Sequence, residues 1–292
     1  MDAITRIEQT LVRAVGTAEA PGAPPGLAAA MRHAVFPRGA RIRPRLCLAV
    51  AAACGNDAPS VTAGAAAAIE LLHCASLVHD DLPCFDDAAT RRGRPSVHRA
   101  FGERLAVLAG DALIVLAFQT LASEAAAAPR RLVPLVLVIA KSVGVPFGIA
   151  AGQAWECEPA VDLAAYHQSK TGALFAAATM AGAFSAGADG AAWRTLGERV
   201  GEAYQVADDI RDAFGTEAEL GKPVGQDAAH DRPSATRQLG LDGAVDRLRQ
   251  LAAEAVAMIP PCPGQAELRS LILSESRRLL PASVSLQAAQ AA

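Results

Sequence analysis

Apolar positions recur at helical spacing along almost the whole chain. Four segments are long and apolar enough to lie at the centre of a domain: residues 61–82, 102–124, 165–186 and 193–215. Turn signals separate the helical stretches without resembling an interdomain linker; they lie at residues 21–25, 55–59, 83, 93–95, 187–190, 221–225 and 260–264. The pattern predicts a single all-α domain over residues 1–292, a large helix bundle whose tail frays from about residue 281.

The composition supports closely packed helices. Of the 292 residues, 52% are hydrophobic but only 4% are aromatic, and alanine tracts occur at residues 65–68, 125–128 and 176–178. Alanine is the strongest helix former, and β-branched runs are few. The composition therefore favours helices that pack on small side chains.

The charge balance limits the classes of partner and location. A formal net charge of −3, from 27 basic and 30 acidic residues, gives no basic surface for a nucleic-acid backbone. The start, MDAITRIEQT, lacks the basic and apolar stretches of a secretory signal. We therefore expect no nucleic-acid partner and a cytoplasmic location.

The most apolar window covers residues 132–152. It holds Lys141, Pro134, Pro146, Gly144 and Gly148, which predicts buried helices around a break rather than a membrane span. No other stretch is expected to come closer to a membrane helix. The six cysteines lack paired ligand spacing and have mostly apolar neighbours, which favours small buried residues over zinc ligands or disulfides. They are Cys47, Cys54, Cys74, Cys84, Cys157 and Cys262.

The stretch HDDLPCFDDAATRRGRPSVH, residues 79–98, carries the first acidic cluster. Its charged members include Asp80, Asp81, Asp86, Asp87, Arg91, Arg92 and Arg94. Magnesium prefers hard oxygen ligands and shares phosphate oxygens, and arginine donates to phosphate, so this segment favours a metal-bridged diphosphate. At about 100° per residue, a continuous helix would place Asp80 and Asp86 on different faces, so we expect Pro83 to break it. The alternative is a solvated acidic loop.

A second acidic cluster lies in YQVADDIRDAFG. Gln205, Asp208 and Asp212 share one predicted helix face, and Asp209 is adjacent. A single cluster of this kind is commonly just solvated. Two clusters, each continuous with an apolar helix, could instead face each other and hold one diphosphate between metal ions, which would relieve the repulsion between the carboxylates.

These motifs resemble those of the trans-isoprenyl diphosphate synthases. The two aspartate-rich motifs occur together with RIRP (41–44), GDAL (110–113), GQ (152–153), KTGALF (170–175) and LGKPVGQD (220–227), in the family's order. The resemblance covers nearly the whole chain and looks closest to bacterial geranylgeranyl diphosphate synthases of carotenoid pathways. It implies an isoprenoid-synthase bundle around a deep central cavity, a homodimer, and the substrates isopentenyl diphosphate and an allylic diphosphate.

The resemblance also implies a role for each matching residue. Asp80, Asp86 and Asp208 would hold the allylic diphosphate through about three magnesium ions, with Asp81, Asp209 and Asp212 in support. Arg91, Lys170 and Lys222 would bind the same diphosphate. Arg43, His73 and Arg92 would bind isopentenyl diphosphate, and Thr171 and Gln205 would join Lys170 in catalysis by stabilising the allylic cation. The diphosphate that leaves can accept the proton, so His79 is expected to have a structural or hydrogen-bonding role.

One departure affects the isopentenyl site. Where the family usually reads Gly-Gly-Lys-x-x-Arg, this chain has Arg38 to Arg43 as RGARIR, so Ala40 replaces a lysine. Arg38 and Arg41 are the candidate substitutes, although a guanidinium is not equivalent to a lysine ammonium. The stretch Asp86 to Ala89 also has fewer acids than is usual.

Product length is predicted with helix geometry as a ruler. A helix advances about 5.4 Å per turn, close to one extended isoprene unit. Ser76 and Ala75 precede Asp80 by about one turn and are small, so the pocket is expected to reach Leu72, with Phe118 as a candidate floor. This favours geranylgeranyl diphosphate over the farnesyl or longer products. Rival functions are a class I terpene cyclase, a metal-dependent diphosphate hydrolase and a non-catalytic subunit of a heteromeric synthase.

Overall fold

The computed structural model describes residues 2–36, 39–159, 166, 168–214 and 234–280. The helices are α1 Ala3–Gly16, α2 Pro25–Val35, α3 Ile42–Ala53, α4 Pro59–Asp80, α5 Val97–Phe101, α6 Glu103–Glu124, α7 Pro129–Val143, α8 Ile149–Ala154, α10 Ala173–Ser185, α11 Arg194–Phe214, α14 Ala235–Ala257 and α15 Gln265–Arg278. Short elements are η1 Thr17–Glu19, η2 Trp155–Cys157, η3 Gln168–Gly172, η4 Gly190–Trp193, β1 Thr90–Arg91 and β2 Arg94–Pro95. The all-α prediction is confirmed, and a two-stranded hairpin was not foreseen.

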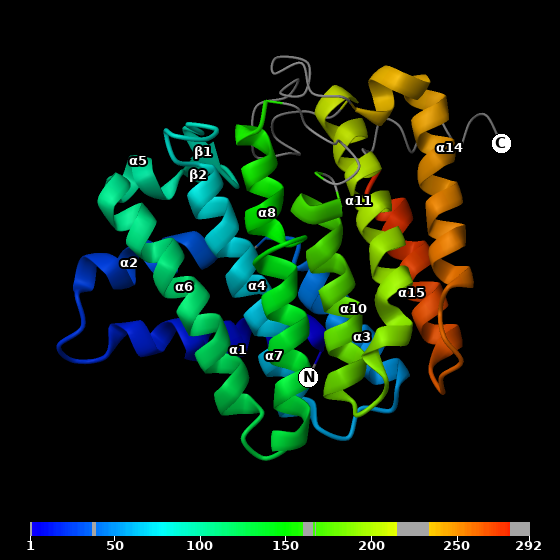
Figure 1. The fold of residues 1–292 in the computed structure, drawn as a ribbon, viewed down its shortest axis with the longest axis horizontal. Helices are drawn as coiled ribbons and strands as arrows, with labels where there is room; N and C mark the ends of the chain where they lie inside the picture. Colours follow the sequence, from blue (N-terminus) through cyan, green and yellow to red (C-terminus); the bar gives the residue numbers. More distant parts are fainter. Residues whose placement is uncertain (1, 37–38, 160–165, 167, 215–233, 281–292) are drawn as a thin grey trace.

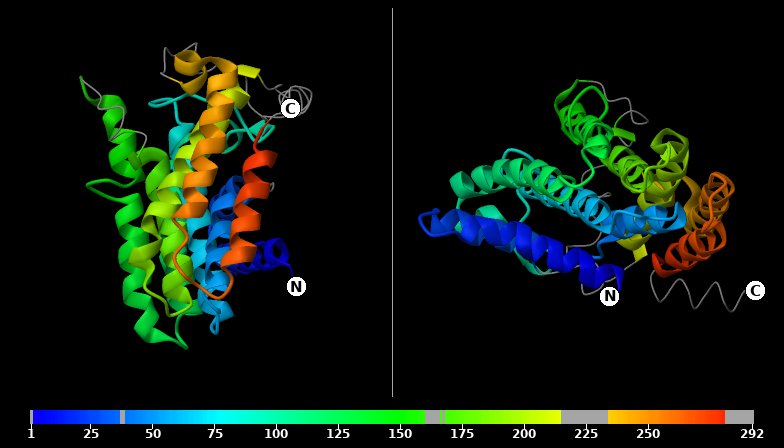
Figure 2. Two further views of the ribbon diagram at one scale, coloured as in Figure 1. Left: turned by 90° about the vertical axis from the view of Figure 1, so that its right-hand side faces the viewer. Right: turned by 90° about the horizontal axis from the view of Figure 1, so that it is seen from below.

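Helix α4 is the central element of the bundle. In Figures 1 and 2, α1 and α2 lie on one side of α4 and α6, while α7 and α10 lie on the other. Every residue from Val61 to Leu72 is buried, in agreement with the apolar pattern of this segment. A Cβ at Gly64 would lie 2.5 Å from the Cβ of Glu124, so α4 and α6 approach each other closely at that glycine.

The prediction for residues 132–152 is only partly right. The chain does break between α7 and α8. One face of α7, with Leu135 and Ile139, is buried, but Val133 and Leu137 on the opposite side are 64% and 52% exposed. The window is therefore not a pair of fully buried helices.

Two other helices come closer to a membrane span by length and composition. They are α4 and α6, whose most apolar windows are 83% and 39% buried. The expectation that residues 132–152 come closest is therefore wrong. Burial accounts for the apolar character of α4 as a core helix, whereas α6 leaves apolar side chains on the surface.

The cysteines follow their prediction only in part. All six are free thiols, but Cys84 and Cys157 are exposed, while Cys47 and Cys74 are buried. Cys84 lies in the turn after α4 and Cys157 ends the short element η2, so neither belongs to the packed face of a long helix.

Candidate active site

The first aspartate motif turns back on itself at the end of α4. The helix ends at Asp80, and the backbone N–H of Asp86 donates to the carbonyl of Asp80 at 3.0 Å. Pro83 lies inside this turn, and a residue before proline disfavours helical geometry. The predicted break is confirmed, and it brings the two carboxylates together.

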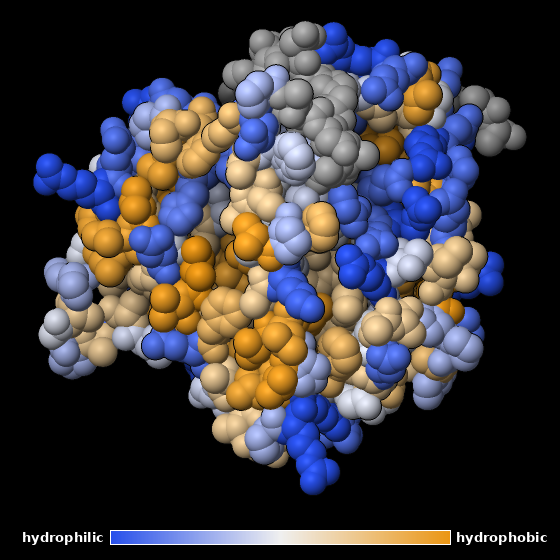
Figure 3. Space-filling view, in the orientation of Figure 1, coloured by the Kyte–Doolittle hydropathy of each residue, from blue (hydrophilic) through white to orange (hydrophobic). Residues whose placement is uncertain are grey.

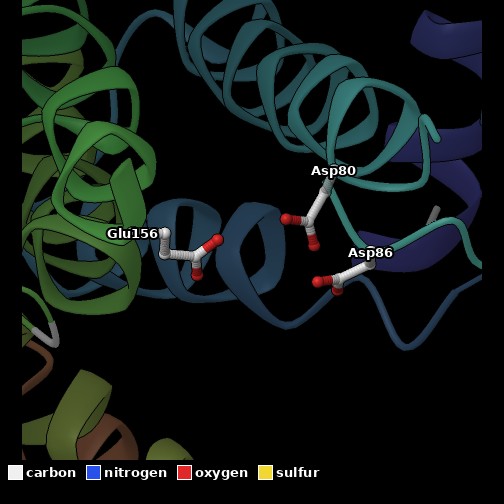
Figure 4. A group of neighbouring side chains, drawn as sticks. All are labelled: Asp80, Asp86 and Glu156. Atoms are coloured by element: carbon white, nitrogen blue, oxygen red, sulfur yellow. The ribbon is translucent and has the colours of Figure 1, made fainter. Parts of the chain in front are cut away.

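A third carboxylate, Glu156, completes the acidic group. One oxygen each from Asp80, Asp86 and Glu156 lie within 4.8 Å of one another, and the three side chains point toward a common space (Figure 4). Three hard oxygen donors at this spacing fit magnesium. Sequence reasoning missed Glu156, although the GQ motif was the available signal: Gln153 Nε2 donates to its carboxylate at 2.8 Å.

Lys170 bridges the acidic group. Its Nζ lies 2.5 Å from Glu156 Oε1 and 3.4 Å from Asp80 Oδ1, and Tyr166 also donates to Glu156. Lys170 belongs to a π-helical turn, where a plain helix was predicted, and a Cβ at Gly152 would lie 2.5 Å from its backbone nitrogen. Burial opposes the positive charge, but the carboxylates raise the pKa of Lys170 overall.

The hairpin β1–β2 places two consecutive arginines. Arg92 and Gly93 form its two-residue turn with positive φ angles of 53° and 73°, as a type I′ turn requires. Arg91 forms an ion pair with Asp81 and lies 4.0 Å from Asp80 Oδ2. Asp81, predicted to support the metal ions, is 2% exposed and holds Arg91 in this structure.

A second, cationic group consists of Arg43, His73 and Arg92. Arg43 stacks on Phe175, with 4.4 Å from the guanidinium carbon to the ring centroid, and its Nη1 lies 3.4 Å from His73 Nε2. Arg43 Nε is buried and has no hydrogen-bond partner among the described residues. Burial and the neighbouring arginines, including Arg92, hold the pKa of His73 well below its usual value. His73 is therefore neutral near pH 7, and the positive charge of the group comes from its arginines.

Helix α11 carries the second aspartate motif at the same end of the bundle as the end of α4 (Figure 1). Thr171 Oγ1 donates to Gln205 Oε1 at 3.1 Å, and Gln205 Nε2 donates to Asp209 at 3.0 Å. The other oxygen of Asp209 accepts from the backbone N–H of Ala235 at 2.8 Å. Asp209 thus orients Gln205. Asp208 accepts from Arg211 within its own helix, and Asp212 is buried.

Arg41 does not substitute for the missing lysine. Its side chain is buried and donates to Glu8, Glu70 and the carbonyl of Val35. The expectation that it could take the place of the lysine is wrong, because Arg41 is 3% exposed and paired with two carboxylates. Arg38 and Lys222 lie outside the described residues. His79 packs against Gly110, in keeping with the structural role expected for it.

A family model described as polyprenyl synthetase matches residues 24–260. The chain belongs to the polyprenyl synthetase family. Geranylgeranyl diphosphate synthases of Cereibacter sphaeroides and Rhodobacter capsulatus are 52% and 51% identical to it over 279 and 280 residues, covering 96% and 95% of this chain and 97% of each relative. A geranyltransferase from Helicobacter pylori, solved with magnesium and isoprenyl diphosphate, is 29% identical with a TM-score of 0.77, covering 94% of this chain and 97% of that one.

The predicted chain-length residues of this polyprenyl synthetase differ in burial. Leu72 and Ala75 are each 1% exposed, whereas Ser76 and Phe118 are half-buried. Ser76 lies one turn before Asp80 on the same side of α4 as His73, to whose carbonyl it donates at 2.8 Å. Of the three residues on α4, Ser76 is therefore the one whose side chain is partly exposed.

Proposed function

We propose that the protein joins isopentenyl diphosphate to an allylic diphosphate, with geranylgeranyl diphosphate as the product. The observation that carries this proposal is a pair of charged groups near the end of α4: three carboxylates with Lys170, and a separate group of Arg43, His73 and Arg92. Identity above half with two geranylgeranyl diphosphate synthases supports the product. Supply of a carotenoid pathway is part of the same proposal.

The acidic group is the proposed allylic subsite. Asp80, Asp86 and Glu156 would hold magnesium together with Asp208, in a cluster of about three ions. When bound, magnesium supplies positive charge that stabilises the departing diphosphate. Arg91, fixed by Asp81, and Lys170 are placed to donate to the same phosphate oxygens.

The cationic group is the proposed isopentenyl diphosphate subsite. Arg41 and Arg91 each donate to a carboxylate, whereas no carboxylate among the described residues lies within 4.0 Å of the Arg43 guanidinium. Arg43 instead contacts the rings of Phe175 and Tyr204 and lies 3.4 Å from His73. A diphosphate would supply the missing negative charge and an acceptor for the buried Nε.

The reaction follows from this arrangement. The allylic C–O bond breaks, and its electron pair leaves with the diphosphate, which Lys170 and Arg91 stabilise more as charge develops. The oxygen dipoles of Thr171 and Gln205, aligned by their mutual hydrogen bond, stabilise the allylic cation. The isopentenyl double bond then attacks the cation, and the released diphosphate accepts the proton.

An elongation assay tests the proposal. Purified protein would be incubated with magnesium, labelled isopentenyl diphosphate and, separately, dimethylallyl, geranyl and farnesyl diphosphates, and the prenyl alcohols analysed after phosphatase treatment. Magnesium-dependent geranylgeraniol is expected. Farnesol as the main product would make farnesyl diphosphate the product in place of geranylgeranyl diphosphate. Release of inorganic diphosphate without elongation would indicate a hydrolase, and a cyclised hydrocarbon would indicate a terpene cyclase. No reaction would favour a non-catalytic subunit.

The Ser76→Phe variant is expected to make mainly farnesyl diphosphate. An aromatic ring at this partly exposed position of α4, one turn before Asp80, would stop the growing chain about one isoprene unit short of the twenty-carbon product. Product analysis under the same assay checks this. Ser270→Phe, at an exposed position on α15, is the matched control and should keep the parental product. Geranylgeraniol from both variants would place the floor of the pocket elsewhere.

We further propose a cytoplasmic homodimer formed through the α6–α7 patch. This name denotes the exposed apolar side chains Val107, Leu108, Val115, Val133, Leu137, Val145 and Phe147. Apolar side chains gather over α6 and α7 in Figure 3. A contiguous apolar surface of this kind is typical of a subunit interface, and a second copy would cover it symmetrically.

Charges introduced into the patch are expected to separate the subunits. Val133→Asp together with Leu137→Asp puts two carboxylates one turn apart on α7, where burial without a partner would cost several kcal/mol. Light scattering after gel filtration should show the parent as a dimer and this variant as a monomer. Val12→Asp, at a 48% exposed position on α1, should remain dimeric. A monomeric parent would contradict the proposed interface.

A further inference from the structure

A carboxylate without an assigned role lies within the most buried part of α4. Glu70 is 2% exposed and is the one charged side chain in the fully buried stretch from Val61 to Leu72. A buried carboxylate is costly unless it is paired, and pairing two charges seldom stabilises a fold more than apolar packing would. A contribution other than stability is therefore worth seeking.

Glu70 lies between two arginines with different surroundings. Its Oε1 accepts from Arg41 Nη1 at 2.6 Å and lies 3.7 Å from Arg92 Nη2. Arg41 is fixed in place, because its Nε donates to Glu8 and its Nη2 donates to the carbonyl of Val35. Arg41 thus fixes the carboxylate, and the carboxylate faces the guanidinium of Arg92.

Arg92 is also constrained at its backbone and by the close approach of Gly39. Its φ of 53° is set by the hairpin turn. A Cβ at Gly39 would lie 2.7 Å from the guanidinium carbon of Arg92, so any side chain at residue 39 would force that guanidinium to shift. Gly39 directly precedes Ala40, where the expected lysine is missing.

We propose that Glu70 is a positioning residue that directs Arg92 to the diphosphate of isopentenyl diphosphate. The site has one cationic side chain fewer than the family pattern, because Ala40 stands where a lysine is expected. The inference rests on the proposed function, since it assumes that this diphosphate binds at the cationic group. Glu70 does not touch the substrate. It acts through Arg92, with Arg41 as its anchor, and the contact between Arg41 and Glu8 is structural.

The test compares Glu70→Gln with Glu8→Gln. Both remove one carboxylate from Arg41, but only Glu70 faces Arg92. Glu70→Gln is expected to raise KM for isopentenyl diphosphate by about tenfold, with KM for the allylic substrate and kcat within about twofold. Glu8→Gln should leave all three within about twofold. Gly39→Ala displaces Arg92 without changing Glu70, so it should reproduce the increase even if Glu70→Gln does not fold.

A double variant and a binding measurement complete the test. In an Arg92→Ala background, Glu70→Gln should add no further increase in KM for isopentenyl diphosphate. Calorimetric titration with isopentenyl diphosphate alone should show weaker binding to Glu70→Gln whether or not the protein elongates, so a failure of the proposed function is seen separately in the parent assay. The inference would be overturned if Glu70→Gln and Glu8→Gln changed KM for isopentenyl diphosphate equally. It would also be overturned if Glu70→Gln raised KM for isopentenyl diphosphate and KM for the allylic substrate by the same factor.

Discussion

The Asp80→Asn variant is expected to turn over about a thousandfold more slowly than the parent, because the charge-stabilising cluster loses one of its carboxylates. Asp80 contributes an oxygen to the group with Asp86 and Glu156, and it is the acid nearest Lys170 after Glu156. An amide of the same shape keeps the packing but removes the negative charge that attracts magnesium. The measurement is kcat at saturating magnesium and substrates.

The same variant should not be less stable without magnesium. Burial raises the pKa of Asp80 above its ordinary value of 3.8, although Lys170 opposes this shift. The folded protein then holds the proton more tightly than the unfolded chain, so this carboxyl favours folding at low pH, and that contribution is lost as pH rises through the raised pKa. At pH 7 the charge opposes folding, and Asp80→Asn should melt at the parental temperature or above.

Asp111→Asn is the matched control for this prediction. Asp111 is a 61% exposed aspartate on α6, 3.7 Å from His79, and has no place in the acidic group. Its replacement should leave kcat within about twofold. Comparable rate losses in the two variants, or a parental rate for Asp80→Asn, would remove Asp80 from the proposed metal site.

The residues that sequence reasoning could place are those joined by local geometry. The turn after α4 follows from Pro83. Helical spacing placed Gln205 with Asp208 and Asp212 and set Asp209 beside them, although it is Asp209 that accepts from Gln205. Each of these depends on a few neighbouring residues, and family motifs added the assignment of roles. The fold class could be predicted for the same reason, since helical periodicity is local.

The residues that were missed depend on contacts distant in sequence. Glu156 lies in η2, directly after α8, and only the folded chain brings this element next to Asp80 at the end of α4. A single acid in so short an element gives no periodic signal in the sequence. Arg41, one of two candidates to replace the missing lysine, is paired instead with Glu8 and Glu70, which lie on the distant helices α1 and α4. The prediction that α7 is fully buried was wrong for the face that carries Val133 and Leu137. Apolar residues at helical spacing predict a helix with an apolar face, but they do not predict whether the same chain covers that face.

Replacement of Arg43 by methionine is expected to lower kcat/KM for isopentenyl diphosphate by about a hundredfold, because a charge-assisted contact to diphosphate is lost. Arg43 stacks on Phe175 and Tyr204, and methionine can keep contact with both rings. KM for the allylic substrate should change little, since Lys170 and Arg91 remain. Initial rates with each substrate varied in turn provide the measurement.

The stability of this variant separates substrate binding from folding. Burial lowers the pKa of Arg43, which means that the fold disfavours its positive charge, so Arg43→Met should melt no lower than the parent. Arg45→Met is the control on the same helix: Arg45 forms an ion pair with Glu275 at 2.7 Å on the far side of α3, and its loss should reduce stability slightly while leaving kinetics unchanged. If Arg43→Met lost stability and kept its affinity for isopentenyl diphosphate, Arg43 would be a structural residue, and the cationic group would not be the isopentenyl site. A more stable, weakly binding Arg43→Met would show that the unpaired charge opposes folding and is needed for the diphosphate.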